Sequence, residues 1–144
     1  MRWLAIALCC FLLGCTNRDP LEEAKAVITS HERYVKAGDL NGVMGNIADD
    51  VVVLTPDTLL VKGTQAFRGF YTWTLSWGRW DIVHQYEGAD VSGDAAVVYG
   101  LVRSTLTQQN GTVTNFSNNF LMILRYQEDG RMKFWRIAYA PGTR

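Results

Sequence analysis

Two histidines are the side chains of this sequence best suited to proton transfer, because imidazole changes its charge near neutral pH. His31 falls on the apolar stripe of a predicted helix, and His84 alternates with Trp80, Ile82 and Tyr86 on a predicted strand. His31 is therefore a candidate general base in an apolar pocket. The alternatives are structural: His31 as a core residue, and His84 on a sheet face or a dimer face. The spacing of the two histidines predicts neither a metal site nor a cofactor.

The other candidate pocket residues come from several predicted elements. Asn118, Phe120 and Met122 share one strand face by alternation, so a buried Asn118 amide would need a ligand or a cross-strand neighbour as its partner. Tyr34 follows His31 by about one helical turn and is a second catalytic candidate. The full set of candidate pocket residues is His31, Tyr34, Thr55, Phe67, Tyr71, Asn118, Phe120 and Met122. For the aromatic members, plain core packing is the alternative.

The first fifteen residues carry a targeting pattern. A basic start precedes an apolar run over residues 3–13, which is shorter than the ~20 residues that a membrane-spanning helix needs. The run therefore predicts a signal peptide over residues 1–14. All three cysteines lie in this region, so after cleavage only Cys15 remains and no disulfide can form.

The end of this run, LLGC at residues 12–15, resembles a bacterial lipobox. The resemblance implies cleavage after Gly14 and lipidation of Cys15, with residues 15–19 as lipidated cysteine and short tether. Thr16 stands where an Asp would favour inner-membrane retention, so we expect a palmitate-bearing lipoprotein on the periplasmic face of the outer membrane. The lipid bilayer is then a partner through the acylated Cys15. The alternative is an ordinary secretory signal.

Capping residues and periodicity predict three helices. Asp19 caps a helix over residues 20–38, and a second, short helix runs through about Ile47. Thr64 is the predicted cap of a third helix that ends near Leu75.

Period-two patterns and turn signals predict the strands. Two short strands over residues 51–54 and 59–61 precede the third helix, and four long strands follow it from Trp80 onward. Tight turns, among them Asn110-Gly111, join the long strands and favour antiparallel neighbours. The predicted fold class is α+β, with three N-terminal helices packed on one face of a curved antiparallel sheet.

Composition limits the size and the partners of this domain. A chain of 144 residues that is 48% hydrophobic supports one sizeable core and not two ordinary domains. With 14 basic and 14 acidic residues it has no cationic excess, which argues against nucleic acid as a partner.

Four segments resemble SnoaL-like domains of the nuclear-transport-factor-2-like superfamily in their order and spacing. They are residues 34–40 (YVKAGDL), 47–51 (IADDV), 62–71 (KGTQAFRGFY) and 124–131 (LRYQEDGR). The resemblance covers about Glu22 to Ala140. It implies a cone, formed by a strongly curved sheet wrapped by helices around an apolar pocket, and often a homodimer.

The same resemblance provides a test for isomerase chemistry. Ketosteroid isomerases use an aspartate base together with a tyrosine and a protonated aspartate that hold the oxyanion. In our alignment Thr55 and Met122 stand at the two carboxylate positions and His31 at the tyrosine position. The isomerase carboxylates are therefore absent.

We expect residues 20–141 to form one SnoaL-like domain that binds a small, largely apolar ligand. Two alternatives from other classes stay open. One is a cofactor-independent dehydratase or cyclase with His31 as base and Tyr34 or Asn118 polarising a carbonyl. The other is an assembly module, in which the open sheet face pairs two subunits or docks an envelope partner.

Overall fold

The computed structural model describes residues 19–57 and 59–142. The predicted signal peptide over residues 1–14 and the predicted lipidation site Cys15 lie outside the described residues, as does most of the tether. No helix in the described part is both long enough and apolar enough to cross a membrane.

The first helix, α1 (Pro20–Ala37), begins and ends as its caps predict. The Leu21 amide donates to the Asp19 carboxylate over 3.0 Å, which satisfies one of the free N–H groups of the first turn. Gly38 ends the helix in the left-handed conformation at φ 68°, which a glycine adopts without steric cost.

The other two helices differ from the prediction at their ends. α2 (Leu40–Gly45) stops before Ile47, because Ile47 is the first residue of strand β1 (Ile47–Leu54) and is buried opposite Phe134. α3 (Gly63–Ser76) starts one residue before Thr64, with Lys62 at the cap position and no side-chain cap bond. The predicted Thr64 cap is therefore wrong.

Six strands form one sheet in the order β2-β1-β6-β5-β4-β3. Besides β1, the strands are β2 (Leu60–Lys62), β3 (Gly78–Ser92), β4 (Ala95–Gln108), β5 (Val113–Tyr126) and β6 (Met132–Pro141). The sheet is mixed rather than purely antiparallel, because β1 pairs with β6 in parallel. The antiparallel prediction holds for the hairpin neighbours that tight turns join, and it fails for this pair, whose strands are far apart in sequence.

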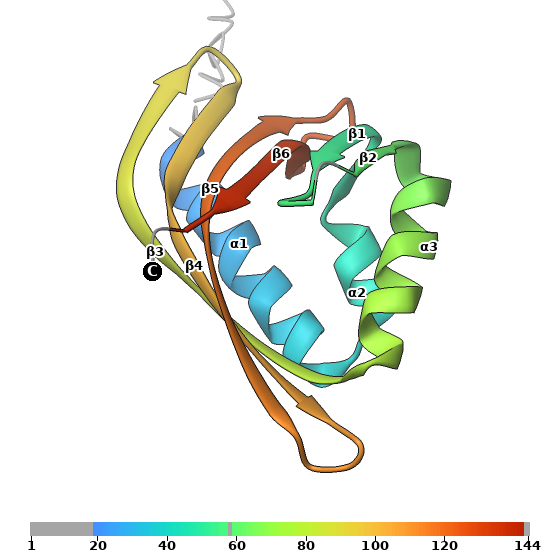
Figure 1. Ribbon diagram of the computed structural model, residues 1–144. Coiled ribbons are helices and arrows are strands. Elements are labelled where there is room, and N and C mark those ends of the chain that lie inside the picture. The colour runs from blue at the N-terminus through green and yellow to red at the C-terminus, as the bar shows by residue number, and fades with distance from the viewer. Residues whose placement is uncertain (1–18, 58, 143–144) are drawn as a thin grey trace, which may run out of the picture.

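The three longest strands bend along their length, and α1 lies on the concave side of the sheet (Figure 1). A bulge in β3 falls between Tyr86 and Gly88, and bulges increase local bending. Opposite it, a Cβ on Gly100 would come within 2.0 Å of the Gln85 carbonyl oxygen, so this close approach of β4 to β3 requires a glycine.

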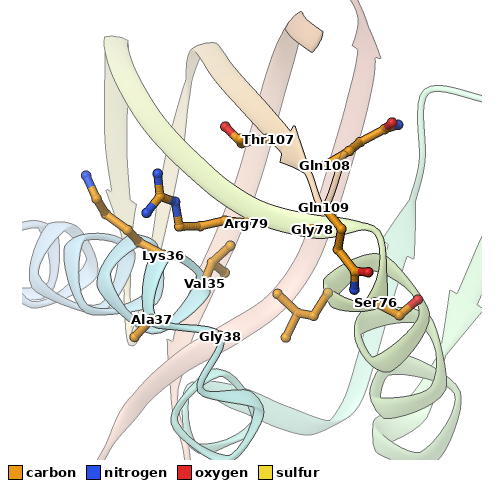
Figure 2. Close-up of a pocket in the computed structure, with 11 residues that line it drawn as sticks. Val35, Lys36, Ala37, Gly38, Ser76, Gly78, Arg79, Thr107, Gln108 and Gln109 are labelled. Carbon is orange, nitrogen blue, oxygen red and sulfur yellow. The ribbon is translucent and has the colours of Figure 1, made fainter. Parts of the chain in front are cut away.

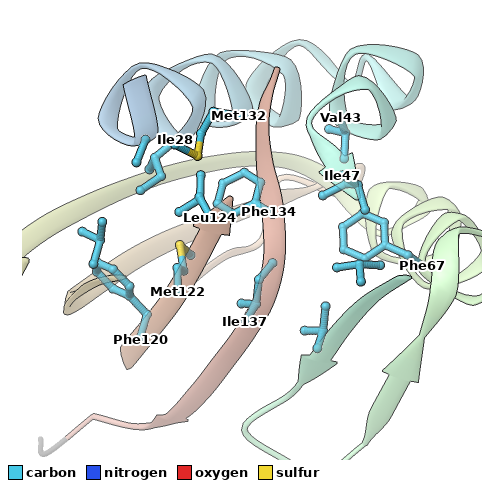
Figure 3. Close-up of a cluster of buried hydrophobic side chains, with 14 of the residues drawn as sticks. Ile28, Val43, Ile47, Phe67, Phe120, Met122, Leu124, Met132, Phe134 and Ile137 are labelled. Carbon is cyan, nitrogen blue, oxygen red and sulfur yellow. The ribbon is translucent and has the colours of Figure 1, made fainter. Parts of the chain in front are cut away.

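The hydrophobic core fills the space between the helices and the concave face of the sheet (Figure 3). Ile28 of α1, Phe67 of α3 and Phe134 of β6 are among its largest fully buried side chains. Both histidines are buried against this core, where His31 of α1 contacts Phe134 and His84 of β3 contacts Phe120.

Candidate functional site

A carboxylate of α1 holds the imidazole of His84. Oxygen Oε1 of Glu32 lies 2.8 Å from His84 Nδ1 and also 2.8 Å from the His84 backbone nitrogen. The His84 side chain is 1% exposed and that of Glu32 is 23% exposed, so water screens this pair only from the glutamate side. These two hydrogen bonds to Glu32 Oε1 fix the backbone of β3 and the imidazole ring of His84 relative to α1.

This geometry determines the tautomer of His84. An ionised carboxylate can only accept hydrogen bonds, so the proton of the neutral imidazole sits on Nδ1. Nitrogen Nε2 is then a bare acceptor. It is buried and has no hydrogen-bond partner among the described residues. The packing around it is aromatic, since the Phe120 ring meets the imidazole edge-to-face at 4.9 Å between centroids.

The second histidine is bonded to a tyrosine instead of a carboxylate. His31 Nε2 lies 2.7 Å from the hydroxyl of Tyr71 on α3, and the Phe134 ring contacts the imidazole at 5.1 Å between centroids. Burial, and to a smaller extent the nearby His84, lower the pKa of His31 to about 3. Burial also raises the pKa of the Tyr71 hydroxyl well above its usual value. Both groups are therefore neutral at physiological pH.

Hydrogen-bond counting favours one tautomer of His31 as well. Tyr71 has no other hydrogen-bond partner among the described residues, so its O–H is satisfied only if it donates to His31 Nε2. The imidazole proton then sits on Nδ1, which is buried and unpartnered among the residues that the structure describes. The reverse arrangement would leave two groups unsatisfied instead of one. With both imidazoles neutral, the site contains an unused donor on His31 and an unused acceptor on His84.

Four of the other predicted pocket residues surround these histidines or the core next to them. Phe67 stacks on Tyr71 at 4.7 Å, and Phe120 contacts His84. Met122 follows Phe120 on the same strand face and is fully buried in the core.

Tyr34 and Thr55 lie in other surroundings. The Tyr34 ring packs against α2, where a Cβ on Gly42 would come within 2.3 Å of it. The Thr55 hydroxyl accepts from the Leu59 amide over 3.0 Å and also bonds to Asp57, so it is used within its own turn.

Asn118 lies on the strand face predicted for it and is half-buried. It borders an open hollow of about 700 Å³ at the end of β6, together with Phe116, Pro141 and others. In the sheet, Asn118 pairs with Val102 of β4 and Pro141 of β6. Neither histidine lines this hollow, so Asn118 lies away from them.

A separate surface cleft of about 590 Å³ opens where α1 and α3 end (Figure 2). Lys36 and Arg79 lie at one side of it, and Lys36 is paired with Asp81 at 2.7 Å. Neither histidine lines this cleft, so it is distinct from the histidine site. Among the described residues, no three His, Cys, Asp or Glu side chains are placed to hold a metal ion.

Glu32 is a candidate site residue that the sequence analysis does not include among the pocket residues. Its charge favours a solvent-facing position on the helix. Its position did contain a signal, because Glu32 follows the buried Ile28 by four residues and precedes the buried Val35 by three. Both spacings belong to the inward stripe of a helix.

The fold is shared with proteins of known structure at low sequence identity. A ketosteroid isomerase-like protein from Erwinia carotovora atroseptica is 19% identical, with a TM-score of 0.75 over 88% of this chain and 99% of the other. A nuclear transport factor 2-like superfamily protein from Salmonella enterica serovar Typhimurium is 13% identical, with a TM-score of 0.74 over 85% and 91%. A protein from Streptomyces avermitilis, provisionally named a dehydratase of the NTF2-like family, is 14% identical, with a TM-score of 0.76 over 87% and 98%.

These identities establish a common fold and no common activity. No curated protein matches the chain at a significant level. The family model of the SnoaL-like domain matches residues 28–135, which is most of the described chain. The chain therefore belongs to the SnoaL-like domain family.

Proposed function

We propose that this protein is a lipid-anchored envelope protein whose SnoaL-like domain binds a small, largely apolar molecule that carries one oxygen function. The observation behind the binding proposal is the pair of unpartnered buried nitrogens, His31 Nδ1 and His84 Nε2. A buried polar group without a partner costs ~1–3 kcal/mol, so a ligand that bonds to it regains that free energy. The aromatic rings around both imidazoles provide the apolar surroundings.

The chemistry of the two nitrogens indicates what the oxygen function is. A hydroxyl accepts from His31 Nδ1–H and donates to His84 Nε2, whereas a carbonyl oxygen satisfies only the His31 donor. His84 also lowers the pKa of His31 electrostatically, which supports a common location of the two imidazoles in the interior. Structural similarity to the provisionally named dehydratase from Streptomyces avermitilis is compatible with a hydroxylated or carbonyl ligand.

A matched pair of probes tests this proposal. 2-Naphthol has an apolar body and one hydroxyl, and naphthalene is the same body without it. We expect 2-naphthol to bind saturably, and we expect His31→Phe or His84→Phe to weaken its affinity about tenfold, the value of roughly one hydrogen bond. Naphthalene affinity should change little. Fluorescence titration measures the dissociation constants of both probes for the parent and for each histidine variant.

Tyr34→Phe is the matched control variant, because Tyr34 lies on the same helix but packs against α2. Its affinity for 2-naphthol should equal that of the parent. The proposal is overturned if 2-naphthol does not bind, or if neither histidine variant distinguishes it from naphthalene.

The anchor is a separate part of the proposal and rests on the LLGC pattern at residues 12–15. Growing cells with a palmitate analogue should label the protein, and Cys15→Ser should abolish the label and leave the precursor uncleaved. Membrane fractionation should place the labelled protein in the outer membrane. A Ser variant that is still labelled would rule out lipidation at this cysteine.

A further inference from the structure

We infer that the outer side of α3 and the adjoining edge of β2 form a surface that docks on an anionic phospholipid bilayer. This inference goes beyond ligand binding in the interior, and it rests on the proposed lipid anchor, which would hold the domain beside the bilayer. The docking surface consists of Leu59, Leu60, Ala66, Phe70, Trp73 and Trp77.

The helix α3 has two apolar stripes, and only one of them packs into the core. Phe67 belongs to the inward stripe and is 1% exposed. The helix lies at the right-hand edge of the molecule in Figure 1, and no other described element covers its right-hand side. A surface helix normally has a single apolar stripe that faces the core, so a second stripe on the outer side indicates a further apolar neighbour. This second stripe has the helical spacing i, i+4, i+7, i+11 and consists of Ala66, Phe70, Trp73 and Trp77.

The outer stripe continues onto β2 without a break. A groove of about 480 Å³ lies between α3 and β2, and Leu59, Leu60, Phe70 and Trp73 are among the residues that line it. Trp73 is 53% exposed and Leu60 is 51% exposed, although both side chains are large and apolar. Trp77 packs edge-on against Trp73, with 4.3 Å between the ring centroids. The result is one contiguous exposed apolar surface.

Positive charge surrounds this surface. The segment over residues 59–80 contains no Asp or Glu, and its three cations are Lys62, Arg68 and Arg79. None of these three cations forms an ion pair with another described residue. Lys62 shares the exposed face of β2 with Leu60. Because the chain as a whole has no net charge, this is a local excess, and it is complementary to anionic phospholipid headgroups.

The two exposed tryptophans favour a bilayer over a protein as the occupant. Trp80 and Trp135 donate their indole N–H groups to protein oxygens, whereas Trp73 and Trp77 donate theirs to no described residue. An indole with a free N–H and an apolar body is suited to the membrane interface, where one end meets acyl chains and the other meets headgroups and water.

The proposed anchor strengthens such a contact. Cys15 is only four residues before Asp19, where the described domain begins, so an acylated Cys15 would keep the domain at the bilayer. Docking would then take place within one tethered complex, and a weak surface contact would suffice because its effective concentration is high.

Quenching by brominated phospholipids tests the docking surface. The lipidated protein, purified from membranes, is reconstituted into vesicles of phosphatidylethanolamine and phosphatidylglycerol that carry ordinary or brominated acyl chains. Bromine quenches an indole only in close contact. Trp3 would leave with the signal peptide, so four of the five tryptophans remain, and two of the four belong to the docking surface. We therefore expect the brominated vesicles to remove roughly half of the tryptophan emission.

A matched pair of variants assigns the quenching to this surface. Ala66→Glu keeps every tryptophan and adds a carboxylate within the docking surface, so most of the lost emission should return because an unpaired charge is costly in the bilayer. Ala26→Glu makes the same substitution at an exposed position of α1, and it should be quenched like the parent. Replacing phosphatidylglycerol by phosphatidylcholine should reduce the quenching, since Lys62, Arg68 and Arg79 then lose their anionic partners.

The inference is overturned if the parent emits equally in both kinds of vesicle, or if Ala66→Glu is quenched as strongly as Ala26→Glu. A blue-shifted emission that bromine does not quench would mean that a protein surface, such as a second copy of the chain, covers Trp73 and Trp77. Failure of the anchor has a separate readout, which is loss of the palmitate label. The unlipidated protein is then added to the same vesicles, where quenching supports the docking surface and its absence overturns it.

Discussion

Replacing Phe134 by alanine is expected to lower the free energy of unfolding by about 3–5 kcal/mol, the range for deleting a fully buried aromatic side chain. Phe134 is fully buried, pairs with Ile47 of β1 and Leu124 of β5, and contacts the edge of the His31 ring. Its removal leaves a cavity where three strands and α1 meet. Urea denaturation followed by circular dichroism measures the loss.

Phe116→Ala is the matched control. Phe116 lies on β5 near the hairpin end and is 38% exposed. Its replacement by alanine therefore deletes the same atoms as Phe134→Ala, but from a less buried position. We expect it to cost about a third as much as Phe134→Ala or less, because the area removed from water is smaller. Equal losses at the two positions would show that the core around His31 is not close-packed.

Acidification from pH 7.5 to pH 5 is expected to lower the free energy of unfolding by about 2 kcal/mol through His31 alone. The pKa of this imidazole is about 3 in the folded state against 6.5 for an unperturbed histidine, because burial disfavours the charged ring. Below pH 6.5 the unfolded chain binds a proton that the folded chain does not. The contribution is therefore fully present above pH 6.5 and is lost as the pH falls toward 3.

The variant His31→Phe isolates the contribution of this imidazole to the pH dependence of stability. At pH 7.5 the variant loses the bond to Tyr71 but also removes the unpartnered Nδ1, so its stability should be within about 1 kcal/mol of the parent. At pH 5 the variant should gain about 2 kcal/mol relative to the parent. Thermal and urea unfolding at both pH values give the difference directly.

Asp50, Asp57 and Asp129 do not disturb this comparison. Hydrogen bonds lower the pKa of each of these carboxyl groups, so the groups titrate below pH 5. Any remaining effect is the same in the parent and in His31→Phe, so it cancels in the difference between their free energies of unfolding. Parallel stability profiles for the parent and His31→Phe would contradict a neutral, buried His31.

The sequence predicted the features that are local. The start of α1 at Asp19 and its end at Gly38 depend on residues within one turn, and the structure confirms both. The antiparallel hairpins joined by tight turns are confirmed for the same reason. The SnoaL-like family was predicted from short segments in order, and the family match supports it.

The features that the sequence did not reveal depend on distant partners. The parallel pairing of β1 with β6 is not encoded in the period of either strand, since alternation reports which face is buried and not which strand lies beside it. The bond between Glu32 and His84 is not predictable from local sequence, because the two residues are 52 positions apart. A helical count places Glu32 on the inward stripe of α1 but does not show that its carboxylate bonds to a strand edge.

The pairing of β1 with β6 has a consequence for how the chain folds. Asp50 and Trp135, whose side chains are hydrogen-bonded, are 85 residues apart in sequence. Contacts of such separation give a high contact order, and the loop between them must close before the pairing stabilises the chain. The hairpins of β3 to β6 can form early, but β1 finds its neighbour only when the last strand is present. Folding is therefore expected to be slow and to finish only after the whole domain has been synthesised.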